Sequence, residues 1–256
     1  MLLLAAATDA ELDASLRGLG VSGLRPEKGA VPSCGACPAE VQGLPGLLAL
    51  AMGVGVINAA WSLGAALSSQ ARHKPRGVVL LGVAGTYDAR RLPLGAVCVA
   101  ASECWPEYGL GTEDGVDARA LKFPLLTEQS GPVWNRMDLE PEQSDRAMGL
   151  SLPGSWPRAA GVTVSTVSGT AERAGTIARA HAGEPLPLME NMEGFAAALA
   201  CRRLGVPLLE VRAVSNLVGS RNPADWNLRA ALEALGEAAR ALLGPEARPG
   251  QTAPHG

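Results

Sequence analysis

The chain of 256 residues is long enough for one large domain or two small ones, and its hydrophobic fraction of 47% supplies a substantial buried core. Only 18% of the residues are charged and the formal net charge is -3, so no basic surface field exists to hold a nucleic acid polymer or an anionic membrane. The five cysteines are odd in number and lie mostly in apolar runs, which favours a reducing, cytoplasmic compartment.

Short apolar runs alternate with helical patterns along the first hundred residues. The segment from Leu47 to Leu67 is uncharged and long enough to cross a bilayer, but its internal glycines, with Asn58 and Ser62, favour a buried strand, a turn and a buried helix. The predicted elements of this half are a strand at Leu2–Ala7, a helix near Ala10–Leu19, a strand at Leu47–Met52, a helix at Val56–Leu67, and strands at Val78–Gly82 and Ala96–Ala101.

The second half begins with many turn-forming residues between Trp105 and Pro157, which predict long loops around one helix. The elements predicted after these loops are a strand at Val162–Val167, a helix at Met192–Leu204, a strand at Leu208–Val214, and a helix that Asn222 caps and that runs to about Leu243. Alternating strands and helices predict a single α/β domain over residues 1–245 with a mixed sheet, followed by a flexible tail at 246–256.

Two short motifs are weak indicators of a cofactor or a metal. Gly53-Val54-Gly55 resembles half of a dinucleotide fingerprint, but no acid follows the next strand to bind a ribose, so a tight strand-to-helix turn is the better interpretation. Cys34 and Cys37 have zinc-ligand spacing without a second pair, and the three histidines are scattered. We therefore expect neither a metal nor an organic cofactor.

Acids and amides gather where predicted strands end. Glu11 lies just after the first strand, Glu190, Asn191 and Glu193 open the helix at Met192–Leu204, and Asn216 follows the strand at Leu208–Val214. Ligands of open α/β sheets bind beyond the carboxyl ends of strands, so these groups could converge on one site. An ordinary alternative for Glu11 and Glu193 is that acids favour the first turn of a helix.

Three segments resemble one known superfamily. Met189–Gly194, followed by Val211–Asn216, is similar to the paired signature of the purine nucleoside phosphorylases and nucleosidases, and Gly82–Thr86 resembles their central strand and loop. Within that superfamily, the segments Val164–Thr170, Glu190–Gly194 and Arg221–Trp226 are most similar to the futalosine hydrolases. The resemblance implies a three-layer α/β/α sandwich with a twisted mixed sheet, and hydrolysis of the N-glycosidic bond that releases hypoxanthine on a route to menaquinone.

The resemblance also implies roles for individual residues. Glu11 would be the general base for water, Glu193 would bind the ribose hydroxyls, and Asn216 would contact the purine. The other substrate-binding positions that it implies are Ala84, Gly85, Thr170, Asn191 and Met192, the last of these against the sugar face.

Asn216 stands where the adenine-cleaving nucleosidases of the superfamily carry an Asp. An amide can donate to a 6-oxo group, so Asn216 favours hypoxanthine or guanine as the leaving base. An amide is no acid, and the proton for the purine would come either through a water or from Asp225. The acidic first turn around Asp9 and Glu11, with Val83 where a phosphorylase would carry a serine, favours hydrolysis over phosphorolysis.

The benzoate of futalosine should require a cation near aromatic side chains. The candidates in the loops and after Asn216 are Trp105, Tyr108, Lys122, Trp134, Arg136 and Arg221. The apolar helix at Val56–Leu67 suits a homo-oligomeric interface. The alternatives left open are a nucleosidase for methylthioadenosine, S-adenosylhomocysteine or aminofutalosine, a purine nucleoside phosphorylase, and a catalytically inactive nucleoside-binding protein.

Overall fold

The computed structural model describes residues 1–21, 38–68, 75–113 and 115–245. Cys34, Cys37 and the tail predicted at 246–256 lie outside these described residues. The α-helices of the described part are α1 (Asp9–Gly18), α2 (Val56–Ser68), α3 (Pro141–Met148), α4 (Ala171–Ala180), α5 (Gly194–Arg203) and α6 (Leu228–Leu243).

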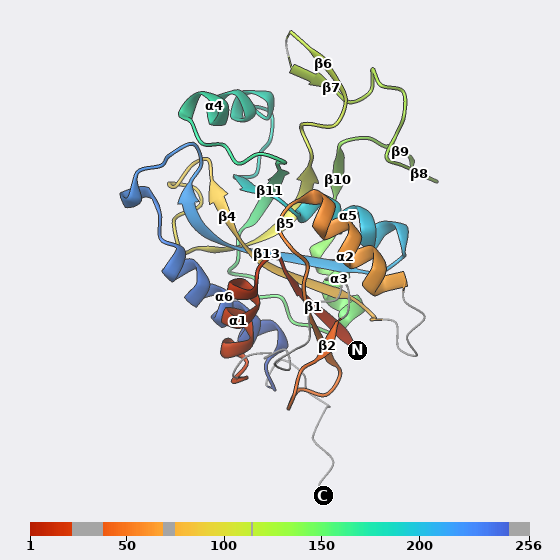
Figure 1. Cartoon of the computed structure of the whole chain (residues 1–256), viewed down its shortest axis with the longest axis vertical. Helices are drawn as coiled ribbons and strands as arrows, with labels where there is room; N and C mark the ends of the chain where they lie inside the picture. The colour runs from red at the N-terminus through yellow and green to blue at the C-terminus, as the bar shows by residue number, and fades with distance from the viewer. Residues whose placement is uncertain (22–37, 69–74, 114, 246–256) are drawn as a thin grey trace, which may run out of the picture.

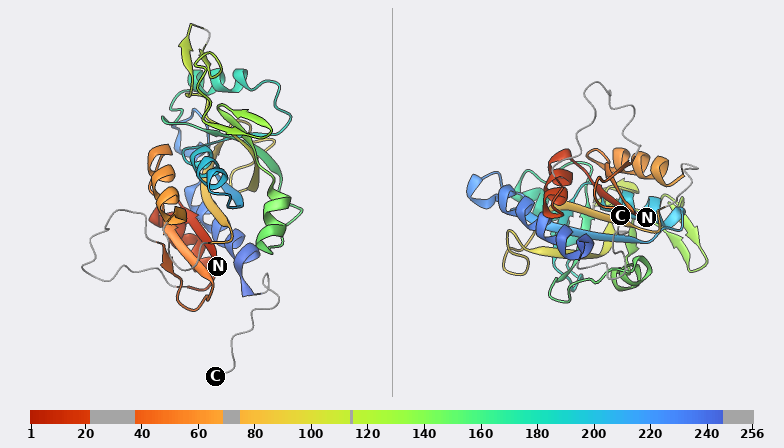
Figure 2. Two further views of the ribbon diagram at one scale, coloured as in Figure 1. Left: turned by 90° about the vertical axis from the view of Figure 1, so that its right-hand side faces the viewer. Right: turned by 90° about the horizontal axis from the view of Figure 1, so that it is seen from below.

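The strands form one mixed sheet and two small hairpins. The sheet contains β1 (Leu2–Ala6), β2 (Ala39–Glu40), β3 (Leu47–Ala51), β4 (Val78–Thr86), β5 (Val97–Cys104), β10 (Arg136–Asp138), β11 (Arg158–Thr163), β12 (Leu188–Asn191) and β13 (Leu208–Leu217). The hairpins are β6 (Leu110–Thr112) with β7 (Gly115–Asp117) and β8 (Leu126–Glu128) with β9 (Gly131–Val133). The β6–β7 hairpin projects from the end of the molecule opposite to the N-terminus (Figure 2).

Strand β4 lies at the centre of the sheet. It pairs in parallel with β1 and β13 and antiparallel with β12. Strand β13 also pairs with β5, and β5, β11 and β12 lead back to β4, so these five strands close a ring. Closure gives each strand of the ring a partner on both sides, which fixes the positions of β4, β12 and β13 relative to one another.

The sheet is covered by helices on both faces (Figure 1). Because side chains alternate along a strand, Leu2 and Leu4 of β1 pack with α1 and α6, whereas Leu3 and Ala5 pack with α2 and α5. The three-layer α/β/α arrangement with a mixed sheet that the sequence predicts is therefore confirmed.

The structure confirms the predicted elements in the first half and lengthens some of them. The strand predicted at Val78–Gly82 continues to Thr86, and the one predicted at Ala96–Ala101 continues to Cys104. The uncharged segment at Leu47–Leu67 is the predicted strand, turn and helix, of which α2 has 13 residues. No helix in the described ranges has the length and apolar character that a membrane span needs.

Several predictions for the second half are wrong. The strand expected at Val162–Val167 ends at Thr163, because the chain there turns away toward α4, a helix that the sequence analysis did not predict. Glu190 and Asn191 belong to β12 rather than to a helix, since they pair with neighbouring strands. The predicted loops at 105–157 contain the strands β6 to β10 as well as the one expected helix, α3.

The start of the last helix also differs from the prediction. Asn222 caps only a short 3-10 turn at Pro223–Asp225, through a bond that its side chain accepts from the Ala224 amide. Helix α6 begins later, at Leu228, with Asn227 as its N-cap. Two successive caps therefore lie between β13 and α6, and Trp226 in this connection forms an isolated β-bridge with Asn216 of β13.

Candidate active site

A cleft of about 210 Å³ lies at the carboxyl ends of β1, β4, β12 and β13. Of the residues that the sequence analysis places at the site, those that line this cleft are Glu11, Ala84, Gly85, Glu190, Asn191, Met192, Glu193 and Asn216. Thr170 is not brought to the cleft: it is exposed, and its side chain caps α4 by accepting from the Arg173 amide. All the predicted site residues except Thr170 therefore converge. They include the general base Glu11, the ribose-binding Glu193 and the purine-contacting Asn216.

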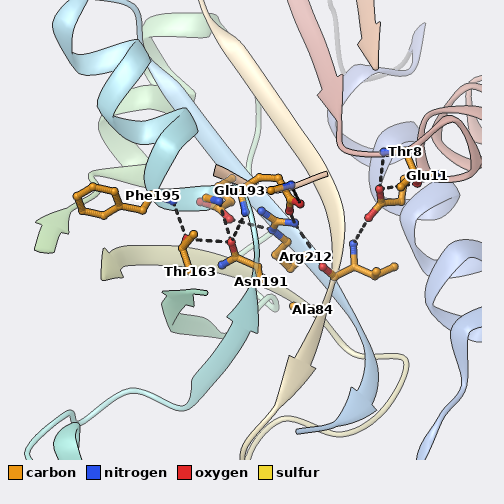
Figure 3. Close-up of polar contacts among 12 residues, drawn as sticks. Thr8, Glu11, Ala84, Thr163, Asn191, Glu193, Phe195 and Arg212 are labelled. Carbon is orange, nitrogen blue, oxygen red and sulfur yellow. Dashed lines mark hydrogen bonds and ion pairs between the residues drawn. The ribbon is translucent and has the colours of Figure 1, made fainter. Parts of the chain in front are cut away.

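Glu11 is held by a capping box at the start of α1. Its Oε2 accepts hydrogen bonds from the Thr8 amide at 2.9 Å and from the Thr8 hydroxyl at 2.7 Å. Its Oε1 accepts from the Val83 amide of β4 at 2.8 Å (Figure 3). The helix-capping interpretation of Glu11 is thus correct, and the hydrogen bond from Val83 to the other carboxylate oxygen ties α1 to β4 and places the carboxylate in the cleft.

Glu193 lies at the N-cap position of α5 but makes no side-chain cap. Its Oε1 accepts from the Gly55 amide at 3.0 Å, and its Oε2 is 3.6 Å from Nη1 of Arg212. Burial raises the pKa of Glu193, and the Arg212 guanidinium opposes that effect. The carboxylate is consequently fixed between α2, α5 and β13, at the wall of the cleft.

Arg212 is a buried cation that the sequence analysis did not single out. Its Nε donates to Oε1 of Glu210 at 2.8 Å, and its Nη1 donates to the Val83 carbonyl at 3.3 Å. Burial alone would lower its pKa, but the Glu210 and Glu193 carboxylates raise it above the ordinary value, so the guanidinium stays charged. The period-two spacing of Glu210 and Arg212 in an otherwise apolar strand is the sequence signal for this buried pair.

Asn191 supports the start of α5 behind Glu193. Its Oδ1 accepts from the amides of Glu193 at 3.0 Å and Gly194 at 2.7 Å, and its Nδ2 donates to Oε1 of Glu103 at 2.7 Å (Figure 3). These contacts satisfy two backbone donors that a helix start leaves unpaired. Asn191 therefore caps α5 in place of Glu193 and leaves the Glu193 carboxylate free to face the cleft.

Glu103 is fully buried beneath this cap. Burial raises its pKa well above the ordinary value, and the nearby Glu210 carboxylate raises it further. The Thr163 hydroxyl lies 2.6 Å from Oε2 of Glu103 and 3.0 Å from Oδ1 of Asn191, and one hydroxyl proton cannot serve both acceptors. A protonated Glu103 removes the conflict, because it donates to Thr163, which then donates to Asn191.

Asn216 lies within β13, not after it as predicted, and faces Gly85 of β4. A Cβ atom on Gly85 would lie 2.7 Å from Cγ2 of Val218 and 3.0 Å from Nδ2 of Asn216, so only glycine lets these two side chains lie so close to β4. The Asn216 amide donates to the Leu217 carbonyl at 3.2 Å and accepts from the Ser215 hydroxyl at 2.8 Å. One of its two N–H donors is left for a ligand.

The proposed alternative proton donor and the candidate benzoate-binding residues lie outside the cleft lining. Asp225 accepts from the Ser220 hydroxyl at 2.6 Å. Arg136 forms an ion pair with Glu184 at 2.8 Å. Arg221 lies 5.5 Å from the ring of Trp226, and of the candidate cations it is the one with a contact to a cleft residue. The remaining candidates do not line the cleft either; they are Trp105, Tyr108, Lys122 and Trp134.

Comparison with known proteins gives one consistent result. Residues 40–244 match the model of the phosphorylase superfamily. The chain is 37% identical over 202 residues to futalosine hydrolase of Thermus thermophilus, covering 78% of this chain and 83% of that protein. It is 38% identical over 161 residues to futalosine hydrolase of Streptomyces coelicolor, covering 63% of this chain and 62% of that protein.

Solved structures share the fold at lower identity. One is the 5'-methylthioadenosine/S-adenosylhomocysteine nucleosidase from Neisseria meningitidis in complex with methylthio-immucillin-A, with a TM-score of 0.64, 18% identity, and coverage of 93% of this chain and 95% of that chain. Another is a futalosine hydrolase mutant of Helicobacter pylori, with a TM-score of 0.62, 15% identity, and coverage of 93% and 96%. These likenesses agree with the architecture described above.

Proposed function

The chain belongs to the phosphorylase superfamily, and we propose that it acts there as its futalosine hydrolase relatives do, by hydrolysing the N-glycosidic bond of futalosine. The products are hypoxanthine and dehypoxanthine futalosine, in menaquinone biosynthesis. One observation carries the proposal: Glu11, Glu193 and Asn216 come from distant parts of the sequence and line one cleft.

Breaking the bond leaves positive charge on the ribosyl group and negative charge on the departing purine. The Glu193 carboxylate accepts hydrogen bonds from the ribose hydroxyls, and Met192, which lines the cleft beside it, packs on the sugar face. An anion beside a developing cation binds the transition state more strongly than the substrate. Arg212 and the Gly55 amide hold the Glu193 carboxylate in position for this contact.

Glu11 takes the proton of the attacking water. The water oxygen forms a bond to C1′ while the bond from C1′ to the purine nitrogen breaks, and a second water molecule supplies the proton that the departing purine takes up. Three donors fix the Glu11 carboxylate, two from Thr8 and one from Val83, and a carboxylate has about four acceptor sites, so one is left for water. Such a positioned base contributes about a hundredfold or more to turnover.

The same contacts favour water over phosphate as the nucleophile. The Val83 amide at the edge of the cleft is a donor of the kind that binds anions, but Glu11 already occupies it. Val83 offers no hydroxyl in addition, and the Glu193 carboxylate lies in the same cleft. Two carboxylates would repel phosphate, which supports hydrolysis.

We also propose that the chain forms a homo-oligomer in the cytoplasm. Residues 1–245 make up its one catalytic domain. Helix α2 exposes Ile57 and Trp61, which are 79% and 64% accessible. Apolar side chains of that size on one helix favour burial against a second copy. Substituting Trp61→Glu should lower the molecular mass measured by light scattering during size-exclusion chromatography, and an unchanged mass would exclude this surface.

A base-release assay tests the proposed reaction. Futalosine, inosine and methylthioadenosine are incubated separately with the enzyme, with and without phosphate, and the free base is followed by chromatography. We expect hypoxanthine from futalosine without phosphate. Release of adenine alone would favour a methylthioadenosine-type nucleosidase, and strict dependence on phosphate would identify a phosphorylase.

A further inference from the structure

Glu190 is a buried carboxylate in the cleft that the mechanism above does not use. It is 6% exposed and lines the cleft together with Asn216. Its Oε1 accepts from the Ser168 amide at 2.9 Å, and its Oε2 accepts from the Ser168 hydroxyl at 2.6 Å and from the Tyr87 hydroxyl at 2.8 Å. Burial and the Glu190 carboxylate raise the pKa of Tyr87, so the phenol remains a donor.

The sheet register places Glu190 opposite Asn216, with Gly85 between them. Glu190 of β12 pairs with Gly85 of β4, and Asn216 of β13 pairs with the same Gly85 from the other side. Residues paired in register point to the same face of a sheet, and two strand spacings amount to about 10 Å. The Glu190 carboxylate and the Asn216 amide therefore line the same cleft on the two strands beside Gly85, where the edge of one planar heterocycle can contact both.

We propose that Glu190 selects a 6-oxopurine by accepting the hydrogen bond of its N1–H group. This inference rests on the proposed function, since it requires the purine of a nucleoside to occupy the cleft. The edge of hypoxanthine presents N1–H as a donor beside O6 as an acceptor. Glu190 accepts from the former, and the free N–H of Asn216 donates to the latter.

Adenine presents the opposite pattern on that edge. Its N1 is an acceptor and would face the Glu190 carboxylate, while its 6-amino group is a donor and would face the free N–H of Asn216. Three of the roughly four acceptor sites of the Glu190 carboxylate are used within the protein, which leaves one for a ligand. A site built to pair a polar group of its substrate discriminates strongly against an analogue that leaves the pair unmade.

The ratio of kcat/KM for inosine to kcat/KM for adenosine measures this selection. In Glu190→Gln we expect the ratio to fall at least about tenfold, because the charge-assisted hydrogen bond to N1–H is lost and the repulsion of adenine is relieved. The matched control is Glu107→Gln. Glu107 accepts from the Ser165 amide at 2.6 Å, so it anchors the same segment as Glu190 without lining the cleft. Its substitution should leave the ratio unchanged.

The possible results separate the two proposals. If both substrates lose activity equally in Glu190→Gln, Glu190 only anchors Ser168 and the inference is wrong, although futalosine hydrolysis stands. If the wild-type enzyme prefers adenosine, the proposed function and the inference both fail.

A measurement on the wild-type enzyme alone avoids any dependence on the folding of a variant. Hypoxanthine and 1-methylhypoxanthine are compared as inhibitors, and the methylated base should bind at least about tenfold more weakly because it lacks the N1–H donor. Equal inhibition would contradict the role of Glu190.

Discussion

Glu103→Gln tests the buried network behind Glu193 by its effect on stability. Glutamine has the shape and hydrogen-bonding pattern of a protonated carboxyl group, so its carbonyl can accept from Asn191 and its amide can donate to Thr163. The pKa of Glu103 is raised in the folded protein from an ordinary value of 4.5. Above the ordinary value the unfolded chain releases the proton that the folded chain keeps, and stability falls as pH rises.

The expected magnitude follows from that single retained proton. The free energy of unfolding of the wild type should fall relative to Glu103→Gln by about 1.4 kcal/mol for each pH unit between the ordinary and the raised pKa. Below the ordinary value the two proteins should differ by a constant amount. Urea unfolding at half-unit intervals from pH 4 to 7 measures this difference. A difference that does not change with pH would show that Glu103 is ionised when folded and would refute the reasoning.

The remaining predictions concern activity. Glu11→Gln and Glu193→Gln should each lower kcat at least about a hundredfold. The control is Asp9→Asn, which changes an exposed acid in the same first turn as Glu11 and should leave kcat unchanged. Near-normal turnover in the Glu11 or Glu193 variant would remove that glutamate from the mechanism. Because burial raises the pKa of Glu193, the acidic limb of the pH profile of kcat/KM should lie above the ordinary carboxyl value of 4.5, and a limb at or below that value would show that the required carboxylate is another one. A Cβ at Gly82 would lie 2.4 Å from Nη1 of Arg212 and 3.2 Å from Oε1 of Glu11. Gly82→Ala should therefore lower the free energy of unfolding in urea by about 1–3 kcal/mol and should also lower kcat. Wild-type values of both would contradict the close packing of Gly82 against Arg212 and Glu11.

The fold was predictable where local pattern and tertiary structure agree. The continuous apolar runs of β1, β3 and β4 are buried on both faces, and their composition alone indicates strands. Strand β12 has only four residues, and two of them are Glu190 and Asn191. Its extended conformation depends on pairing with β4 and β11. Such pairing is a long-range property that a short polar segment does not reveal.

The functional groups of the site were predictable, and the buried residues that hold them in position were less so. Glu11, Glu193 and Asn216 carry recognisable functional groups beside strand ends, and the structure brings them together. Glu103 and Arg212 act from behind the cleft. Arg212 lies inside an apolar strand where only core is expected, and Glu103 lies beyond Ala101, where the predicted strand ends. A charged residue in the middle of such a strand is costly to bury unpaired, so it should be treated as evidence for a buried partner.

The most direct test of the proposed site is the crystal structure of the Glu11→Gln variant with futalosine bound. We expect the ribose hydroxyls within hydrogen-bond distance of Glu193, the purine in contact with Glu190 and Asn216, and the side chain at position 11 one water molecule away from C1′. A nucleoside bound outside this cleft, or bound within it with its sugar remote from Glu193, would contradict the assignment.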